Sequence, residues 1–527
     1  MKAITSKIDP KSEKFKENKA WMSEKLKELG ELTKKSKWQG EDKHIERAKK
    51  EGKMLARDRI NKVLDKGSPY LELLPLAGYG QNSFALGGTM TGGIGLVSDK
   101  LCMVVANIAT IKGGAIDSVT LKKAQRLNEI ARENELPTIY LVESAGANLT
   151  EQAKIFNLGG TNFREITRRS KKGIPSISVV FGNSTAGGAY IPGMSDYVIM
   201  IKNQSKVFLA GPPLVKMATG EESDDESLGG AEMHSRISGV SDFLAKNEAE
   251  AIEIARDLMS VIDAVPMKNA YPPKAKDPIY DLKENLGIAS IDHKKPFDIR
   301  EIIARIVDGS EFLEFKSEYG PTLVTGYAYI HGFKVGILGN NGVLVSEASN
   351  KGAHFIQLCN KNNTPLIFLQ NISGFMVGKR YEQGGIIKDG AKMINAVSNS
   401  GVPALTVMVG NSYGAGNYAM CGRAFQPRFL FSWPNSKIAV MGGQQLAGVM
   451  EMIQVKSGRS TPEEAKAGAE VLTKMVDEQS SAFYATGQLW DDGVIEPDKT
   501  REYLGMGLAI INRTKIEGTN NYGVFRM

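Results

Sequence analysis

Residues 173–190 read GIPSISVVFGNSTAGGAY, and residues 401–418 read GVPALTVMVGNSYGAGNY. Each stretch places an apolar run directly before a turn rich in glycine, and the two stretches are offset by 228 residues. The same offset aligns ELPTIYLVESAG, residues 135–146, with NTPLIFLQNISG, residues 363–374. One register without gaps indicates that the chain contains an internal duplication. Further pairs at this offset are Gly114 and Gly342, Lys123 and Lys351, and Asn134 and Asn362.

Both copies predict the same succession of helices and strands. Apolar runs of about four to six residues, bounded by turn signals, are typical of buried strands in a largely parallel sheet. Alternating strands and helices favour the α/β class with right-handed crossovers. The expected helices are 121–134 and 350–362, each with a second helix after the following strand, and the expected strands are 138–142, 176–181, 366–370 and 404–409.

The length of 527 residues exceeds what one hydrophobic core supports, which is roughly 250–300 residues. We therefore expect two domains, residues 1–285 and 286–527. Residues 12–65 read as a helical extension of the first domain. The segment 265–296 holds five prolines and reads as a surface linker, and residues 524–527 form an apolar end that is a candidate for docking.

Composition argues against several classes of protein. The net charge of +7 is spread along the chain without a basic patch interleaved with aromatic residues, so nucleic-acid binding is not expected. Cys102, Cys359 and Cys421 form no zinc or disulfide pattern, which favours a reducing compartment and predicts no metal. No apolar run reaches the roughly 18 residues that a membrane span needs. The first residues do not resemble a transit peptide, so a cytoplasmic location is expected.

Small residues follow the second strand of each copy, at Ala186-Gly187-Gly188 and Gly414-Ala415-Gly416. Carboxyl ends of parallel strands are where α/β folds bind ligands. Without bulky side chains, backbone N–H groups can face a ligand, and two of them converging on one oxygen form an oxyanion hole. The alternative is that the glycines only permit close packing of helix on strand. Two clusters in the same register favour a functional role.

Other short motifs carry less weight. Residues 410–414, GNSYG, match the nucleophile elbow of serine hydrolases, but the counterpart at 182–186, GNSTA, breaks that pattern. None of the five histidines has an obvious orienting partner in the sequence. Lys392 follows Gly390-Ala391 in a faint likeness to a biotinylated lysine, yet it lies in sequence that predicts a helix.

Longer motifs resemble the carboxyltransferase family of biotin-dependent acyl-CoA carboxylases. The resemblance runs from about residue 10 to Met527, and its closest branch is that of the methylcrotonyl-CoA carboxylase β subunits. The motifs are Phe208–Lys216, Ala218–Glu222, Leu228–Ala231 with His234, Ser238–Val240, Gly339–Gly342, Gln370–Gly378, Gly384–Met393, Trp433-Pro434 and Val440–Gly442.

This resemblance implies two crotonase-like ββα superhelix domains and a hexamer whose active sites lie between the N domain of one protomer and the C domain of another. It implies that Gly187-Gly188 and Ala415-Gly416 act as oxyanion holes, one for the thioester carbonyl and the other for the ureido carbonyl of biotin. It also implies that no protein side chain need act as general base. The substrate-binding residues it implies are Gly113, Gly114, Ser144, Ala145, Gly146, Ala186, Asn340, Asn341, Gly342, Gly374, Phe375 and Gly414.

The chain has no ATP-grasp loop and no biotin-acceptor domain. The resemblance therefore implies a separate biotin carboxylase and biotin carboxyl carrier α subunit that brings carboxybiotin, while a CoA thioester is the substrate. Methylcrotonyl-CoA is the first expectation. Ile116-Asp117, Glu143–Ala147 and Gly384–Ile386 depart from the methylcrotonyl pattern, so propionyl-CoA or another acyl-CoA stays open, as does a biotin-dependent decarboxylase. A crotonase-type hydratase and a non-enzymatic scaffold are the remaining alternatives.

Overall fold

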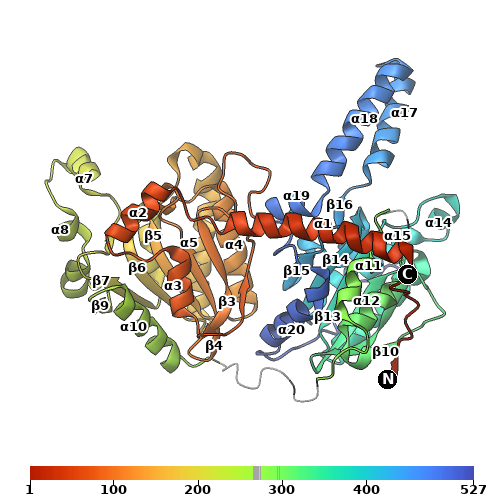
Figure 1. The fold of residues 1–527 in the computed structure, drawn as a ribbon, viewed down its shortest axis with the longest axis horizontal. Helices are drawn as coiled ribbons and strands as arrows, with labels where there is room; N and C mark the ends of the chain where they lie inside the picture. The colour runs from red at the N-terminus through yellow and green to blue at the C-terminus, as the bar shows by residue number, and fades with distance from the viewer. Residues whose placement is uncertain (265–271, 273–274, 293–294, 296) are drawn as a thin grey trace. The chain divides into compact units, whose positions relative to one another are not determined.

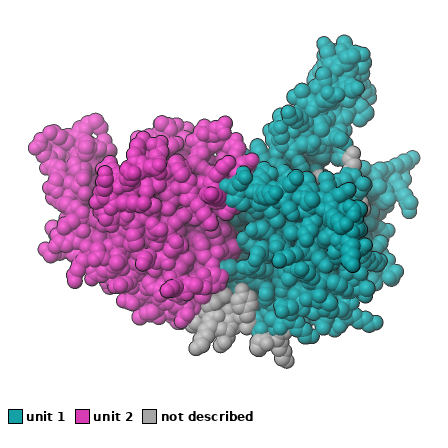
Figure 2. Space-filling model, in the orientation of Figure 1, with its two compact units in different colours: residues 1–31, 271–527 teal, residues 32–270 magenta. Residues whose placement is uncertain are grey.

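The computed structural model describes residues 1–264, 272, 275–292, 295 and 297–527. The chain divides into two compact units, each built on its own eight-stranded sheet. Figure 2 colours unit 1, residues 1–31 and 271–527, in teal, and unit 2, residues 32–270, in magenta.

The sheet of unit 2 has the strand order β2-β3-β4-β5-β6-β7-β9, with β8 paired to the far end of β6. Figure 1 labels β3, β4, β5, β6, β7 and β9 of this sheet. Its first three strands are antiparallel, and the strands from β4 onward are parallel. The strands are β2 (Tyr70–Glu72), β3 (Met90–Val97), β4 (Lys100–Asn107), β5 (Thr138–Ser144), β6 (Ser176–Thr185), β7 (Tyr197–Ile201), β8 (Lys206–Phe208) and β9 (Phe243–Ala245).

Helices complete unit 2. Apolar residues of α3 and α10 pack with Val104, Ile139 and Phe181 in one buried cluster, which explains why these strands read as continuous apolar runs. The pair α4 and α5 supplies the crossovers on either side of β5. The helices are α2 (Asp42–Lys50), α3 (Ala56–Val63), α4 (Ser118–Glu133), α5 (Gln152–Lys171), α6 (Tyr190–Met194), α7 (Pro212–Thr219), α8 (Asp225–Gly229), α9 (Ala231–Met233) and α10 (Glu248–Val261).

The sheet of unit 1 repeats this plan in the order β1-β10-β11-β12-β13-β14-β15, with β16 paired to β14. The strands are β1 (Lys2–Ala3), β10 (Glu311–Glu314), β11 (Leu323–Ile330), β12 (Phe333–Asn340), β13 (Leu366–Ile372), β14 (Ala404–Tyr413), β15 (Phe429–Ser432) and β16 (Lys437–Ala439). The longer helices are α12 (Ile299–Ile306), α13 (Ser346–Lys361), α15 (Ile386–Ser398), α17 (Gly443–Lys456), α18 (Pro462–Gln479) and α20 (Thr500–Ile511), and the shorter ones are α11 (Asn285–Ile288), α14 (Lys379–Gln383), α16 (Ala415–Ala419) and α19 (Ala482–Gly487).

The duplication is confirmed by irregular features as well as by regular ones. Strands β5 and β13, and β6 and β14, begin and end at the same offset of 228 residues. The pairing register shifts between Val142 and Ser144 in one sheet and between Gln370 and Ile372 in the other. Isolated bridges join Ile116 to Ala147 and, at the same offset, Leu344 to Phe375. The expected helices and strands are therefore present, with β6 running on to Thr185 before its turn begins.

The N-terminal residues group with unit 1, although the sequence places them in the first domain. Lys2 pairs with Phe312 in the sheet, and the Ser6 hydroxyl donates to Glu301 at 2.6 Å. The ring of Phe15 packs on Gly287 so closely that a Cβ there would clash with it. The boundary between the two units therefore falls within helix α1 (Glu13–Ser36), after Glu31.

Two expectations about connecting segments need correction. The described part of 265–296 is not only a surface linker, because it contains α11, in which Asn285 and Ile288 are buried. Several residues of that segment lie outside the described residues. At the C-terminus, Tyr522 is buried against the core of unit 1 with Phe525 beside it, whereas Met527 is exposed. The tail thus docks through its aromatic residues.

Candidate active site

The glycine turn of unit 2 follows β6 directly. Residues Ala186–Ala189 form one turn of 3-10 helix, and α6 continues it. Ala186 has a φ of 52°, a left-handed conformation that turns the chain sharply out of the strand. The first amides of a helix have no acceptor within that helix. Gly187 is exposed and Gly188 is half-buried, so the backbone of this turn is accessible to a ligand.

A second loop backs this turn. Gly146 has a φ of 88°, and a Cβ at that position would lie 2.9 Å from the carbonyl oxygen of Thr185. A Cβ at Gly188 would lie 3.9 Å from the Cα of Gly146, an ordinary contact. The loop after β5 and the turn after β6 therefore touch through backbone. This brings the predicted residues Gly146, Ala186, Gly187 and Gly188 together.

A third loop joins them from the end of β4. The Ser144 hydroxyl donates to the carbonyl of Gly114 at 2.8 Å and accepts from the Gly146 amide at 3.1 Å. The Ala145 amide donates to the carbonyl of Gly113 at 2.9 Å. Gly113 and Gly114 both have positive φ, and two successive left-handed residues of this kind favour glycine. All the residues predicted in unit 2 thus lie in one cluster at the carboxyl ends of the strands.

The glycine turn of unit 1 follows β14 in the same way. Gly414 has a φ of 56° and a ψ of −149°, a combination open only to glycine, and α16 begins at Ala415. Ala415 is exposed, whereas Gly416 is buried. A Cβ at Gly416 would lie 2.6 Å from Cγ1 of Ile372 and 3.1 Å from the Cα of Gly374. Close packing therefore requires glycine at 416, while Ala415 presents the more open amide.

The other residues predicted in unit 1 have mixed roles. Asn341 is engaged at the strand end, where its side chain accepts from the Ile299 amide and donates to Asp298 at 3.1 Å. The ring of Phe375 packs on α15, so close to Gly390 that a Cβ there would lie 2.9 Å from the ring. Asn340 is buried and accepts from the Asn371 amide, and its Nδ2 has no partner among the described residues. Gly342 has a φ of 138°.

Both candidate nucleophilic serines are structural. Ser412 is buried, donates to Oε1 of Gln370 at 2.6 Å and accepts from Nδ2 of Asn417 at 2.7 Å. Ser184, its counterpart, donates to the carbonyl of Gly188 at 3.0 Å. These bonds hold each turn in place. A serine nucleophile would instead need a free hydroxyl and a histidine beside it.

His234 and Lys392 are also accounted for by local structure. Contrary to the sequence reading, His234 has orienting partners, since Nδ1 lies 2.6 Å from the Ser238 hydroxyl and Nε2 lies 2.7 Å from the carbonyl of Val207. Lys392 lies on α15 and pairs with Asp389 at 3.0 Å, as predicted for a helix lysine.

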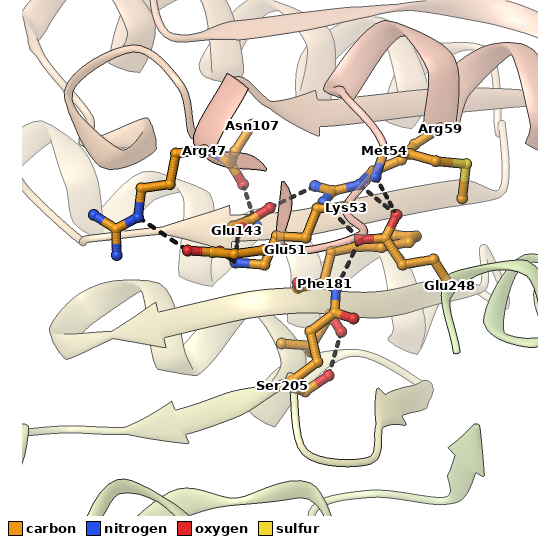
Figure 3. Close-up of polar contacts among 12 residues, drawn as sticks. Arg47, Glu51, Lys53, Met54, Arg59, Asn107, Glu143, Phe181, Ser205 and Glu248 are labelled. Carbon is orange, nitrogen blue, oxygen red and sulfur yellow. Dashed lines mark hydrogen bonds and ion pairs between the residues drawn. The ribbon is translucent and has the colours of Figure 1, made fainter. Parts of the chain in front are cut away.

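Behind the turn of unit 2 lies an ion network that the sequence did not indicate (Figure 3). Arg59 is 3% exposed and donates to Glu143 at 2.6 Å and to Glu248 at 2.9 Å, with Phe181 stacked 4.3 Å from its guanidinium. Lys53 lies 3.2 Å from Glu143. Burial opposes the charge of Lys53, but Glu143 and Glu51 outweigh it and hold its pKa above the ordinary value. Glu143 directly precedes Ser144, so the network anchors the loop that backs the turn.

An apolar wall borders the same turn. The ring of Phe163, on α5, would lie 3.6 Å from a Cβ at Gly187, and its centroid is 5.5 Å from that of Tyr190. Among the described residues, no group of three or more His, Cys, Asp or Glu side chains is placed to hold a metal ion. Across the same described part of the chain, no helix combines the length and apolarity of a membrane span.

The two sheets and their paired turns define a duplicated α/β protein of the crotonase-like class. A protein-family profile described as carboxyl transferase domain matches residues 47–522. The chain belongs to this family of carboxyltransferase subunits of biotin-dependent acyl-CoA carboxylases.

Three relatives illustrate the match. A probable biotin-dependent acyl-coenzyme A carboxylase beta2 subunit of Mycobacterium tuberculosis is 52% identical, over 99% of this chain and 100% of its own. A probable mitochondrial methylcrotonoyl-CoA carboxylase beta chain of Drosophila melanogaster is 48% identical, over 99% and 95%. The crystal structure of the P. aeruginosa geranyl-CoA carboxylase beta subunit superposes with a TM-score of 0.90 at 44% identity, covering 99% of both chains.

Proposed function

We propose that this chain transfers a carboxyl group from carboxybiotin to an acyl-CoA thioester. The observation that carries the proposal is the pair of glycine turns after β6 and β14, each of which begins a helix and exposes backbone, at Gly187 and at Ala415. Carbonyl oxygens that gain negative charge are the natural ligands of such amides. Carboxyl transfer involves two such carbonyl oxygens, one on the thioester and one on the biotin ureido group.

The chemistry divides simply between the ligands and the chain. Bound carboxybiotin supplies CO2 and, through the freed ureido nitrogen, takes the proton that the acyl group loses. The chain's amides at one turn stabilise the enolate oxygen of the thioester, and a carbon of the enolate then attacks CO2 to form the new C–C bond. Removing one such donor typically lowers a rate by about 10²–10³-fold. The chain thereby acts by orientation and electrostatics, and no side chain need serve as base.

Methylcrotonyl-CoA is the proposed acyl substrate. The relatives named for methylcrotonoyl-CoA and geranyl-CoA act on acyl groups that share a methyl branch on a conjugated double bond. Phe163 and Tyr190 beside the turn of unit 2 supply an apolar wall suited to such a group. Propionyl-CoA and other acyl groups, and the reverse reaction of a decarboxylase, are the alternatives.

We further propose the assembly in which the reaction takes place. A separate biotin carboxylase and biotin carboxyl carrier subunit brings carboxybiotin, a proposal supported by the match to carboxyltransferase subunits of biotin-dependent carboxylases. The subunit described here forms a homo-oligomer, a hexamer, with active sites shared between protomers. The placement of one glycine turn in each unit supports such a shared site.

The test uses the purified full chain with free carboxylated biotin and a panel of methylcrotonyl-CoA, propionyl-CoA and geranyl-CoA. The proposal expects carboxylated thioester by mass spectrometry, with methylcrotonyl-CoA turned over fastest. Hydration of the double bond without carboxylation would identify a hydratase, and no reaction with any thioester would leave only a scaffold. Either result would overturn the proposal.

A further inference from the structure

Residues His234–Ser238 form one turn of π-helix in unit 2, directly after α9. Single π-helical turns are rare and are frequent at functional sites. This turn brings the side chains of its first and last residues together, since Nδ1 of His234 lies 2.6 Å from the Ser238 hydroxyl. Neither side chain has a part in the proposed carboxyl transfer, so the pair is a site in search of a role.

The surroundings of His234 determine which ring nitrogen carries the proton. The residue is only 8% exposed, and its Nε2 lies 2.7 Å from the carbonyl oxygen of Val207 on β8. A carbonyl oxygen can only accept a hydrogen bond, so Nε2 is the protonated nitrogen of the neutral ring. Nδ1 is then left as an acceptor, and it faces the Ser238 hydroxyl. The backbone of β8 thus selects the tautomer in which His234 can take a proton from Ser238.

Ser238 differs from the buried Ser184 and Ser412, whose hydroxyls donate to groups that hold the glycine turns. Ser238 is exposed. Within the described part of the chain its hydroxyl meets the imidazole and the amide of Val240, which donates to it at 3.4 Å. An accessible hydroxyl, a base at hydrogen-bond distance and a third group that orients the base are the parts of an activated serine nucleophile.

We propose that Ser238 is a nucleophile activated by His234, and that esters or thioesters with a good leaving group acylate it. Oγ of Ser238 attacks the carbonyl carbon and forms a C–O bond, while its proton passes to Nδ1 of His234. The bond from that carbon to the leaving oxygen or sulfur then breaks, and the leaving group takes the proton from Nδ1. The neutral imidazole is restored and the acyl group stays on Ser238. This activity is separate from carboxyl transfer and does not depend on it.

The experiment incubates the full chain with p-nitrophenyl acetate or with acetyl-CoA and locates acetyl groups by mass spectrometry of peptides. We expect acetyl on Ser238, with a rate that falls about 10²-fold in His234→Gln. Ser235→Ala is the matched control, because Ser235 lies on the same turn but donates to the carbonyl of Ala231 at 2.8 Å. This control should be acetylated at Ser238 as fast as the unmodified chain.

A second pair of variants keeps His234 in place, since its replacement in a buried position can disturb the fold. Ser238→Cys puts a thiol beside the imidazole, and Ser260→Cys puts one at an exposed serine whose hydroxyl donates to a backbone carbonyl. The three native cysteines are buried and do not compete. The thiolate is the reactive form, so iodoacetamide should alkylate Ser238→Cys about tenfold faster than Ser260→Cys.

Each outcome decides the proposal. If neither acetyl donor modifies Ser238, or if a folded His234→Gln is acetylated at the original rate, the proposal is wrong. If His234→Gln does not fold, equal alkylation of Ser238→Cys and Ser260→Cys would show that the imidazole does not activate this position. Acetyl from acetyl-CoA would support the proposal with thioesters as the donors, and acetyl from the ester alone would support it with reactive esters as the donors.

Discussion

The Cα of Gly374 lies so close to Gly416 that a Cβ at Gly416 would be 3.1 Å from it and 2.6 Å from Cγ1 of Ile372. We therefore predict that Gly416→Ala destabilises unit 1, because the strand end and the loop must move apart. Overpacking of this kind costs roughly 1–3 kcal/mol. Thermal unfolding would show a lowered Tm, and an unchanged Tm would show that the loop yields freely.

Ala415 tests the turn of unit 1 without this steric problem. Proline is tolerated at the first position of a helix, where the missing N–H has no partner within the helix. Ala415→Pro should therefore fold but lower carboxyl transfer by about 10²–10³-fold, whereas Ala415→Ser, which keeps the amide, should stay near the original rate.

The same pair of variants assigns the role of this turn. Cleavage of free carboxybiotin without acyl-CoA reports on the ureido carbonyl, and exchange of deuterium into the acyl group reports on the enolate. Whichever partial reaction Ala415→Pro slows identifies the carbonyl that this turn binds. A variant with both partial reactions intact would remove the turn of unit 1 from the mechanism.

Arg59 is predicted to matter for stability. Arg59→Met leaves the buried Glu248 without its cation and leaves the half-buried Glu143 with Lys53 beside it. Breaking one partner of a buried network costs about 3–5 kcal/mol. Unfolding in denaturant should show this loss. Arg47→Gln, at an exposed position on α2, should lower the stability very little. Equal stability of Arg59→Met and the unmodified chain would contradict the structural role of the network.

The buried carboxyl group of Asp491 should make the stability of the fold depend on pH. Burial raises its pKa to about 6, although Ser432, Thr486 and Arg423 act in the opposite direction. A carboxyl whose pKa is higher in the folded state binds more protons there, so its contribution to stability is full below about pH 4 and is lost as pH rises through 6. The loss amounts to about 3 kcal/mol.

Asp491→Asn should therefore remove this dependence and unfold at a higher temperature near pH 7. Asp257→Asn, an exposed position on α10, serves as control and should leave the pH profile unchanged. If Asp491→Asn kept the same profile between pH 4 and pH 6, another group would have to be responsible.

Much of the fold was predictable because the central strands are buried on both faces. Residues 138–142 and 404–409 read as short apolar runs led by proline, and both became strands of a parallel sheet. The glycine turns were predictable because they repeat at one offset. The conformations of Ala186 and Gly414 then confirmed that the chain turns sharply there.

Other features depend on contacts that local patterns do not encode. Arg59 meets Glu143 and Glu248 across separations of 84 and 189 residues. In the sequence, Arg59 belongs to a charged helical stretch that reads as a solvated surface. The strand at Lys2-Ala3 is two residues long and carries no pattern of its own, so its pairing with β10 could not be foreseen. Of these residues, only Glu143 stood out in the sequence, because it departs from the pattern of the methylcrotonyl-CoA carboxylase branch.

Gly188 offers the most direct test of the central claim that backbone amides at these turns carry out the transfer. A Cβ at Gly188 would make only ordinary contacts, 3.8 Å from the Ser184 hydroxyl and 3.9 Å from Gly146, so Gly188→Ala keeps both the fold and the amide. Gly188→Pro removes the amide N–H and adds the proline ring. The measurement is the rate of carboxyl transfer to methylcrotonyl-CoA by the two folded variants. We expect Gly188→Ala to retain most of the rate and Gly188→Pro to lose about 10²–10³-fold. Equal rates in the two variants would contradict the account.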